Sequence, residues 1–470
     1  MENVKENKLG TMKISKLLFS ISVPIIISMM VQALYNVVDS IFVAGFDSKN
    51  GTGALTIAFP VQNLILALSV GLAVGTNALL SRSLGQKDFK KANKIAGQGI
   101  FLNLCGYLIF LLIGLFLVKP FVGTLADEGT LLYDYSVDYL SWVCIGSIGV
   151  FIQVIMERLL QSTGKSVLSM IIQGSGAIIN IILDPILIFG YLGLPALGVE
   201  GAAIATVIGQ WFAAILGIIL NLTCNKELRL KLKNLIPDLK ILGEMLVIGI
   251  PAVMMQAIGS IMTYSMNKIL IGFGEDSMNV FGVYFKLQSF VFMPIFGLNN
   301  GMIPIIAYNY GAKYKNRMVA TVKLAGVCAI GYMLSGFTMF QVAPTLLLGL
   351  FKASSDMLAI GIPALRTISI SFLFAGLSVI CIAVFQAVGS SIYSLIVSVG
   401  RQLVVLIPVA FLLSLSGKVA NIWWAFPIAE LMSVALCVFF MTRVIKKVGI
   451  VRSDVFKTRE KVENASQISE

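Results

Sequence analysis

The feature that most constrains the fold of this chain is a series of about twelve apolar runs, each long enough to cross a bilayer as a helix of about 20 residues. Irregular backbone cannot cross lipid in their place, because its polar groups would be left unpaired. Only 12% of the 470 residues are charged, and histidine is absent. The sequence therefore predicts an all-α polytopic membrane protein, with spans at 17–43, 53–81, 95–118, 136–160, 166–190, 200–223, 242–273, 279–307, 319–350, 360–386, 391–415 and 419–444.

The basic residues indicate how the chain is oriented in the membrane. Most of the 35 Lys and Arg residues lie in the two terminal segments and in the loops that follow even-numbered spans. This is the positive-inside pattern, and it predicts that both termini are cytoplasmic. The net charge of +12 thus reflects membrane orientation, and we expect no nucleic-acid partner. We expect a monomeric multi-pass protein of the plasma (inner) membrane.

The two halves of the chain repeat each other at a nearly constant spacing. Six spans in each half mean that both halves enter the membrane from the same side, as parallel repeats around a central cleft. The predicted organisation is a lead-in (1–16), an N-terminal six-helix lobe (17–224), a cytoplasmic connector (225–241), a C-terminal six-helix lobe (242–446) and a disordered tail (447–470). Residues of the first half that recur in the second are Pro24, Gly45, Gln62, Gly71, Gly75, Gln161 and Gly164, matched by Pro251, Gly272, Gln288, Gly297, Gly301, Gln386 and Gly389.

Two acidic residues within spans of the first half are the strongest functional candidates. Asp39 lies fifteen residues after Pro24 in the first span, and Asp184 lies in the fifth. A carboxylate inside a membrane is costly, so it normally faces a cavity or a partner. Helical spacing places further polar groups near the two acids, namely Gln32, Tyr35 and Asn36 in span one, Gln173 and Asn180 in span five, and Thr206 and Gln210 in span six.

The acidic site is predicted for the first half alone. The positions that match Asp39, Asn180 and Asp184 in the second half are Met266, Val405 and Val409. Carboxylate, amide and hydroxyl oxygens suit Na⁺. Two carboxylates in one apolar pocket can equally hold a proton, because both cannot stay ionised at low cost. The residues do not decide whether H⁺ or Na⁺ is the coupling ion. They also allow a purely structural role, in which the two acids only form hydrogen bonds between helices.

Other charged residues have simpler interpretations. Arg401 and Glu430 lie at similar depth in the last two spans and could form an ion pair, whereas Lys286 could reach the membrane surface or line the cleft. We expect Glu157 and Arg158, near the cytoplasmic end of span four, to form a surface ion pair. Gly71 and Gly75 form a G-x-x-x-G pattern, which favours close helix packing.

Motifs that would make the chain an enzyme are missing from the sequence. Acid–base or metal chemistry through histidine is excluded, and there is no G-x-S-x-G motif and no phosphate-binding loop. We therefore expect no enzymatic activity and no cofactor other than a coupling ion. A non-transporting receptor would leave two buried aspartates unexplained.

Three motifs together resemble the multidrug and toxic compound extrusion (MATE) family, in particular its prokaryotic DNA-damage-inducible branch and Gram-positive multidrug relatives. They are P-x(7)-Q-x-x-Y-N-x-x-D-x-x-F-V-x-G from Pro24 to Gly45, L-G-Q at 84–86 before a basic loop, and N-x-x-x-D-P from Asn180 to Pro185. The resemblance covers about residues 12–447.

The resemblance implies export of amphipathic, often cationic drugs in exchange for H⁺ or Na⁺. It implies a cation site at Asp39, Asn180, Asp184 and Thr206, which would bind metal only if the coupling ion is Na⁺. Pro24 matches a proline at which the first helix is thought to bend. A lipid-linked oligosaccharide flippase of the same architecture is the alternative. For the drug we expect contacts with Gln32, Tyr35, Asn36 and the methionines Met29, Met262 and Met266.

Overall fold

The computed structural model describes residues 7–47, 49–351 and 354–450, and every regular element among them is helical. In these described ranges, ten helices are long and apolar enough to cross a membrane. Two further spans are bent pairs of helices, at 43° between Leu131–Gly146 and Ile148–Ser162 and at 47° between Ser355–Ser369 and Phe372–Ala387. Within the described residues, the predicted all-α fold with up to twelve spans is confirmed.

The chain divides into two compact units, at different places from those expected. We call residues 23–253 the N-lobe, and residues 1–22 with 254–470 the C-lobe. The chain therefore passes from one unit to the other inside two continuous helices, α2(Ile14–Phe46) and α10(Leu239–Leu270), rather than in the connector. Pro24 and Pro251 lie close to these two crossing points.

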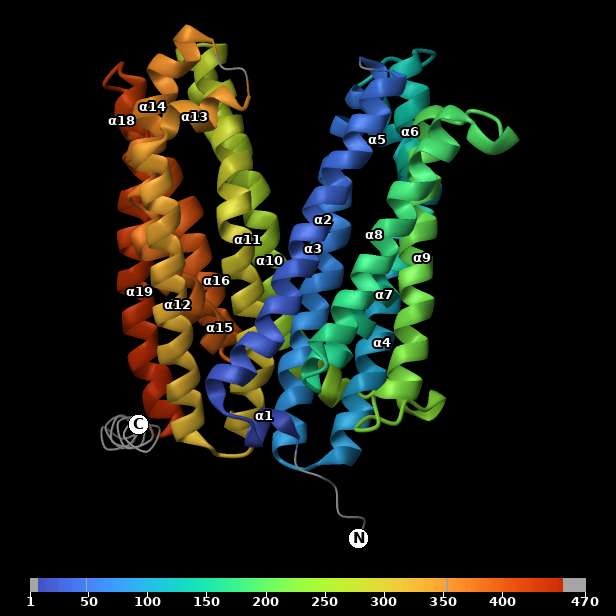
Figure 1. Ribbon diagram of the computed structural model, residues 1–470, viewed down its shortest axis with the longest axis vertical. Coiled ribbons are helices and arrows are strands. Elements are labelled where there is room, and N and C mark those ends of the chain that lie inside the picture. Colours follow the sequence, from blue (N-terminus) through green and yellow to red (C-terminus); the bar gives the residue numbers. More distant parts are fainter. Residues whose placement is uncertain (1–6, 48, 352–353, 451–470) are drawn as a thin grey trace, which may run out of the picture. The chain divides into compact units, whose positions relative to one another are not determined.

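The N-lobe contains the greater part of α2 and the spans that follow it (Figure 1). Its connector, expected at 225–241, includes a short 3-10 turn and leads into the first part of α10. The other elements are α3(Asn50–Gly85), α4(Phe89–Leu112), η1(Ile113–Leu117), α5(Val118–Gly123), α6(Leu131–Gly146), α7(Ile148–Ser162), α8(Ser166–Phe189), η2(Tyr191–Gly193), α9(Gly198–Cys224) and η3(Leu232–Leu235).

The described part of the C-lobe begins at residue 7 and resumes within α10. Span nine ends earlier than predicted, at Val342, where a break precedes a short helix. The elements are α1(Lys8–Thr11), η4(Ile271–Phe273), α11(Glu275–Gly311), α12(Lys315–Val342), α13(Pro344–Gly349), α14(Ser355–Ser369), α15(Phe372–Ala387), α16(Ser391–Val399), η5(Gly400–Leu406), α17(Ile407–Ser414), α18(Val419–Ile422) and α19(Ala425–Val448).

Glycines explain how each lobe accommodates the start of the other repeat. In the N-lobe, a Cβ at Gly75 would lie 2.5 Å from the carbonyl oxygen of Met245 on α10. A Cβ at Gly71 would lie 2.6 Å from the backbone nitrogen of Val253. In the C-lobe, a Cβ at Gly301 would lie 3.0 Å from the Cα of Ser22. The G-x-x-x-G pattern therefore serves backbone-to-backbone packing, as the sequence predicted.

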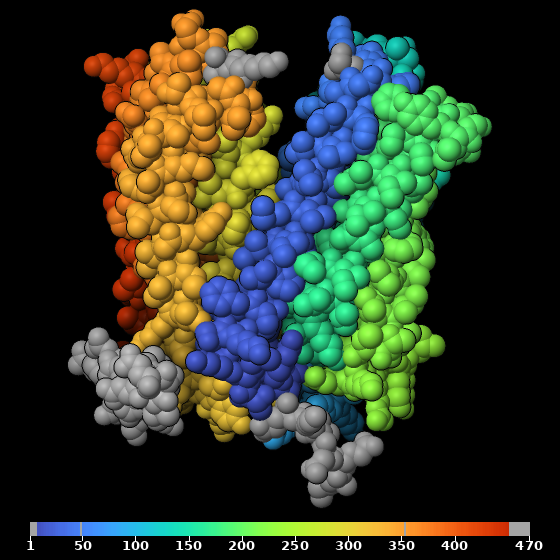
Figure 2. Space-filling model, viewed as in Figure 1, coloured from blue at the N-terminus to red at the C-terminus, as the bar shows by residue number. Residues whose placement is uncertain are grey.

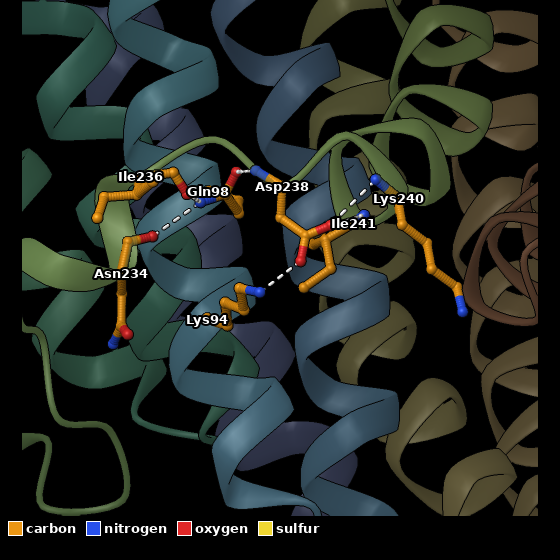
Figure 3. Close-up of polar contacts among 7 residues, drawn as sticks. All are labelled: Lys94, Gln98, Asn234, Ile236, Asp238, Lys240 and Ile241. Carbon is orange, nitrogen blue, oxygen red and sulfur yellow. Dashed lines mark hydrogen bonds and ion pairs between the residues drawn. The ribbon is translucent and has the colours of Figure 1, made fainter.

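Hydrogen bonds hold the connector to α4 (Figure 3). The buried amide of Gln98 donates to the carbonyl oxygens of Asn234 at 2.8 Å and Ile236 at 2.7 Å, and it accepts from the backbone N–H of Asp238 at 2.9 Å. Asp238 pairs with Lys94 and also accepts from the backbone N–H groups of residues 240 and 241, so it caps the start of α10. The connector is thus part of the N-lobe.

The beginning of the chain is held to the C-lobe in a comparable way. Arg317 donates to the carbonyl oxygens of Leu9 at 3.1 Å and Met12 at 2.7 Å. Asn309, which is fully buried, also donates to Leu9 O at 3.1 Å. Each lobe therefore uses a buried amide to bind the backbone that precedes the first helix of a repeat. The basic side chains differ, because Arg317 binds backbone carbonyl groups whereas Lys94 binds the carboxylate of Asp238.

Candidate functional site

Asp39 lies in the N-lobe part of α2 and is only 7% exposed. Its neighbours Val37 and Ile41 are 48% and 62% exposed, so the apolar face of the helix points outward and the carboxyl points into the lobe. Asp39 Oδ1 is buried and has no hydrogen-bond partner. An acceptor in that position requires a proton, a donor or a cation.

The second acid lies on α8, which runs beside α9 (Figures 1 and 2). Asp184 is fully buried, whereas Ile178 and Ile182 on the same helix are more than half exposed. Asn180 donates through Nδ2 to Asp184 Oδ1 at 3.2 Å and to Thr206 Oγ1 of α9 at 3.3 Å. Three of the four residues predicted for the cation site are therefore joined by hydrogen bonds.

Two glycines allow this contact between α8 and α9. A Cβ at Gly209 would lie 2.7 Å from the carbonyl oxygen of Gly176 and 3.2 Å from the Cβ of Asn180. A Cβ at Gly176 would lie 3.0 Å from the carbonyl oxygen of Gly209. The absence of side chains at both positions brings the helix backbones close enough for Asn180 to reach Thr206.

Asp39 of α2 lies within electrostatic range of Asp184. Three oxygens of this group are buried without a donor: Asp39 Oδ1, Asp184 Oδ2 and Asn180 Oδ1. All three are acceptors, and the carboxylates repel each other when both are charged. The chemistry of the group fits a cation or protons and does not fit an anion.

Two tyrosines lie beside the acids, and the sequence predicted only one of them. Tyr35, one turn before Asp39 on α2, is within electrostatic range of both carboxylates. Tyr139 of α6 is also in that range, and its hydroxyl accepts a hydrogen bond from Gln62 at 3.0 Å. Gln62 has a matching residue in the second repeat, Gln288, and this recurrence was a weak indication of a role. Nothing in the sequence pointed to Tyr139, because it lies within α6 and only the packing of that helix brings it near the acids.

The residues expected to contact the drug are divided between the lobes. In the N-lobe, Gln32 accepts a hydrogen bond from Gln173 at 2.8 Å, Met29 is half-buried and Asn36 is exposed. In the C-lobe, Met262 and Met266 are buried. Their role in substrate binding stays a prediction.

Glu157 and Arg158 correct the prediction of a surface ion pair. Both side chains are buried, each 8% exposed. Glu157 Oε1 accepts from Gln153 at 3.0 Å, and Arg158 Nη1 donates to Gln161 at 2.9 Å. Consecutive residues of a helix point in different directions, and each therefore finds an amide partner one turn away instead of the other charge.

The predicted pairing in the last two spans is confirmed. Arg401 Nη1 and Glu430 Oε2 are 3.1 Å apart in the C-lobe. Lys286 lies over the ring of Phe351, with its nitrogen 5.9 Å from the ring centre. Both members of the ion pair, Arg401 and Glu430, thus belong to the C-lobe.

This arrangement is that of a polytopic helical membrane protein built from two repeats, with an acidic cluster in one of them. The MatE family model matches the chain twice, over residues 24–186 and 251–412. The chain belongs to the MATE family of multidrug export transporters. The two matched segments are the two repeats seen in the sequence.

Among proteins with similar sequences is the multidrug export protein MepA of Staphylococcus haemolyticus (strain JCSC1435). It is 28% identical over 428 residues, which cover 91% of this chain and 93% of MepA. The similarity therefore extends across the membrane domain and includes both repeats.

Solved structures with the same fold include MATE in a straight conformation and in a bent conformation. The straight form superposes with a TM-score of 0.88 at 23% identity, covering 95% of this chain and 99% of that one. The bent form gives a TM-score of 0.86 at 23% identity, covering 93% and 96%. At this level of identity, the likeness establishes the fold.

Proposed function

We propose that this multidrug exporter is an antiporter that exchanges amphipathic, often cationic compounds for H⁺ or Na⁺ by alternating access. The observation that carries the proposal is the group of buried acceptor oxygens of Asp39, Asp184 and Asn180 without donors, all in the N-lobe. Such a group binds a cation or protons more favourably than it remains empty, because unpaired buried carboxylates are costly. Thr206 supplies a further hydroxyl oxygen for Na⁺.

Competition between the cation and the substrate follows from this chemistry. When Asp39 and Asp184 are ionised, the site attracts a cationic compound. When a proton or Na⁺ neutralises them, that attraction is lost and the compound is released. The apolar body of the compound would contact Tyr35 and the flexible side chains of Met29, Met262 and Met266, and Gln32 and Asn36 would offer hydrogen bonds.

The available driving force is sufficient. One charge moving through 100 mV supplies about 2.3 kcal/mol. At about 1.4 kcal/mol per tenfold gradient, one ion sustains a substrate gradient of about fiftyfold.

Pro24 is our candidate for the hinge. It lies inside α2, next to the point where the chain passes from the C-lobe to the N-lobe. A proline in a helix removes one backbone hydrogen bond and permits bending. The straight and bent conformations of the structurally similar MATE are consistent with such a movement.

The remaining features are proposed from the sequence pattern. The basic residues of the terminal segments and of the loops that follow even-numbered spans favour cytoplasmic termini. We further propose that the protein lies in the plasma membrane and acts as a monomer. A lipid-linked oligosaccharide flippase has no support in the described residues of the acidic site, and the similar sequences are named for multidrug export.

The test is uptake or efflux of ethidium by proteoliposomes under an imposed pH gradient and, separately, an imposed sodium gradient. We expect one gradient to drive transport by the wild-type chain and Asp39→Asn to abolish the driven component. Asp127→Asn is the matched control, because it neutralises an exposed acid of the same lobe in a loop. Equal driven transport by Asp39→Asn and wild type would refute the coupling role.

A further inference from the structure

The charged pair of the C-lobe lies between the same two helices of the repeat as Asn180, Asp184 and Thr206 in the N-lobe. Asn180 and Thr206 lie on spans five and six, and their counterparts by the repeat are Val405 and Leu431 on spans eleven and twelve. Glu430 directly precedes Leu431, and Arg401 lies one turn before Val405. Each lobe thus places buried polar groups between its fifth and sixth spans, at similar depth.

The local backbone supports the position of Arg401. It lies in the π-helix η5, which packs on α19. Pro408 follows and has no N–H for the carbonyl four residues earlier, which favours a local change of helix type. The side chain of Arg401 is 24% exposed and that of Glu430 is 6% exposed, so the carboxylate is the more deeply buried member of the pair.

One oxygen of this carboxylate remains unused. Glu430 Oε2 binds Arg401, but Glu430 Oε1 is buried without a hydrogen-bond partner. The hydroxyl of Tyr284, on α11, is likewise buried without a partner and lies within electrostatic range of both charges. The C-lobe therefore contains an acid with a free acceptor oxygen, as the N-lobe does, but with a cation of its own.

We propose that Arg401 is a built-in counter-ion that takes the part of the coupling cation in the C-lobe, and that Glu430 is a latent cation-binding carboxylate which Arg401 keeps out of the transport cycle. This inference deepens the proposed function and rests on it. It explains why two similar lobes would couple through only one of them. The coupling ion cannot bind the carboxylate of Glu430, because the guanidinium of Arg401, a side chain of the same protein, already neutralises it.

Removal of the guanidinium should expose this latent property. Breaking one side of a buried ion pair leaves an uncompensated charge, and a buried carboxylate then becomes neutral by taking up a proton. The charged and titratable groups against Glu430 are Arg401 from η5 and Tyr284 from α11. Further along α19 lies Cys437, which interacts with Cys381 of α15. Among these described groups, only Arg401 supplies positive charge.

Infrared difference spectroscopy of the purified full-length protein tests this, because protonated carboxyl groups give a distinct carbonyl band. At neutral pH, Arg401→Gln should gain one protonated carboxyl per chain relative to wild type. Arg401→Lys keeps a positive charge and should show no gain. The double variant Arg401→Gln/Glu430→Gln should also show none, which assigns the new band to Glu430.

Two results would overturn the proposal. One is a folded Arg401→Gln protein, eluting as wild type on size exclusion, whose carboxyl band does not increase. The other needs no Arg401 variant: if Glu430→Gln removes a carboxyl that titrates near neutral pH in wild type, Glu430 is not silent. Because the spectra record protonation and not transport, their outcome is independent of the transport test of Asp39.

Discussion

The two lobes share one six-helix plan, yet they treat buried charge in opposite ways. The N-lobe buries Asp39 and Asp184 without a basic partner among its described residues, whereas the C-lobe buries Glu430 against Arg401. The scaffold does not impose this difference, since both lobes hold the start of a repeat with glycines and a buried amide. Under the proposed function, a few side chains therefore decide which copy responds to an ion.

The same comparison applies to the ends of the lobes. Gln98 in the N-lobe and Asn309 in the C-lobe both bind backbone carbonyl groups of the segment before a first helix. The N-lobe adds a carboxylate, Asp238, which pairs with Lys94. The C-lobe uses Arg317 on carbonyl groups instead. These contacts give measurable differences between the lobes.

Among substitutions at matched positions of the two lobes, the largest effect is expected at Asp184. Asp184→Asn should lower ion-driven transport by at least about tenfold, equivalent to about 1.4 kcal/mol. A neutral amide cannot alternate between a charged form that attracts a cationic substrate and a form neutralised by the coupling ion. Val409→Ala changes the matching position of the C-lobe and should leave coupling intact. Ethidium flux in proteoliposomes measures both. If the two variants were equally impaired, the functional contrast between the lobes would be wrong.

Glycine substitutions should destabilise both lobes, and the N-lobe more. A Cβ at Gly75 meets backbone atoms of Met245 and Gly249 at 2.5 and 3.2 Å, and backbone cannot move aside easily. Gly75→Ala should cost about 1–3 kcal/mol, seen as a lower unfolding temperature in detergent. Gly301→Ala meets mainly the side chain of Ser22 and should cost less.

Gly326→Ala is the control for these variants. A Cβ there has no atom within 4 Å, and alanine favours a helix over glycine by about 0.5–1 kcal/mol. The unfolding temperature should rise slightly. A fall as large as that of Gly75→Ala would mean that the close contacts are not the cause.

A smaller, local effect is expected for Gln98→Leu. This substitution leaves two carbonyl groups and one N–H of the connector without their hydrogen-bond partner. Leaving a buried polar group unpaired costs about 1–3 kcal/mol of stability. Hydrogen exchange of residues 229–238 should accelerate while α8 and α9 stay protected. Asn309→Leu should loosen residues 8–12 less, because Arg317 still binds Leu9 O. Unchanged exchange in the connector would show that it is not held by Gln98.

The smallest effect is a pH dependence confined to the N-lobe end. The hydrogen bond from Lys94, with further bonds from backbone N–H groups, lowers the pKa of Asp238 below its usual value. A carboxyl with a lowered folded pKa stabilises the connector above its unfolded pKa of about 3.9, and this contribution is lost as the pH falls through the lower folded value. Connector exchange should therefore accelerate in that acidic range.

Asp238→Asn tests the origin of this dependence. In that variant, exchange of the connector should not change with pH in the same window, apart from the intrinsic rate. Hydrogen exchange of residues 8–12 of the C-lobe should also be independent of pH in this window, because Arg317 binds their backbone carbonyl groups and no carboxylate takes part. An acid-dependent loosening of residues 8–12 as large as that of the connector would contradict the comparison.

Much of the fold and part of the site could be predicted from the sequence. The ends of the spans were predicted to within about six residues, as at Phe89 where span three begins, except that span nine ends at Val342. The hydrogen bonds of Asn180 with Asp184 and Thr206 follow from helical spacing within one span and the approach of the next. Tyr139 and the burial of Glu157 could not be predicted, because both depend on which helices pack around them.

The sequence by itself determined the number and positions of the spans, the duplication and the restriction of the acidic cluster to the first half. These properties are local, since a run of apolar residues must match the thickness of the bilayer wherever it packs. Only the tertiary structure decided that the chain changes lobes inside α2 and α10, near Pro24 and Pro251, and that the connector belongs to the N-lobe. Such choices depend on the fit of surfaces far apart in the chain, at glycines such as Gly75, and no local pattern encodes that fit.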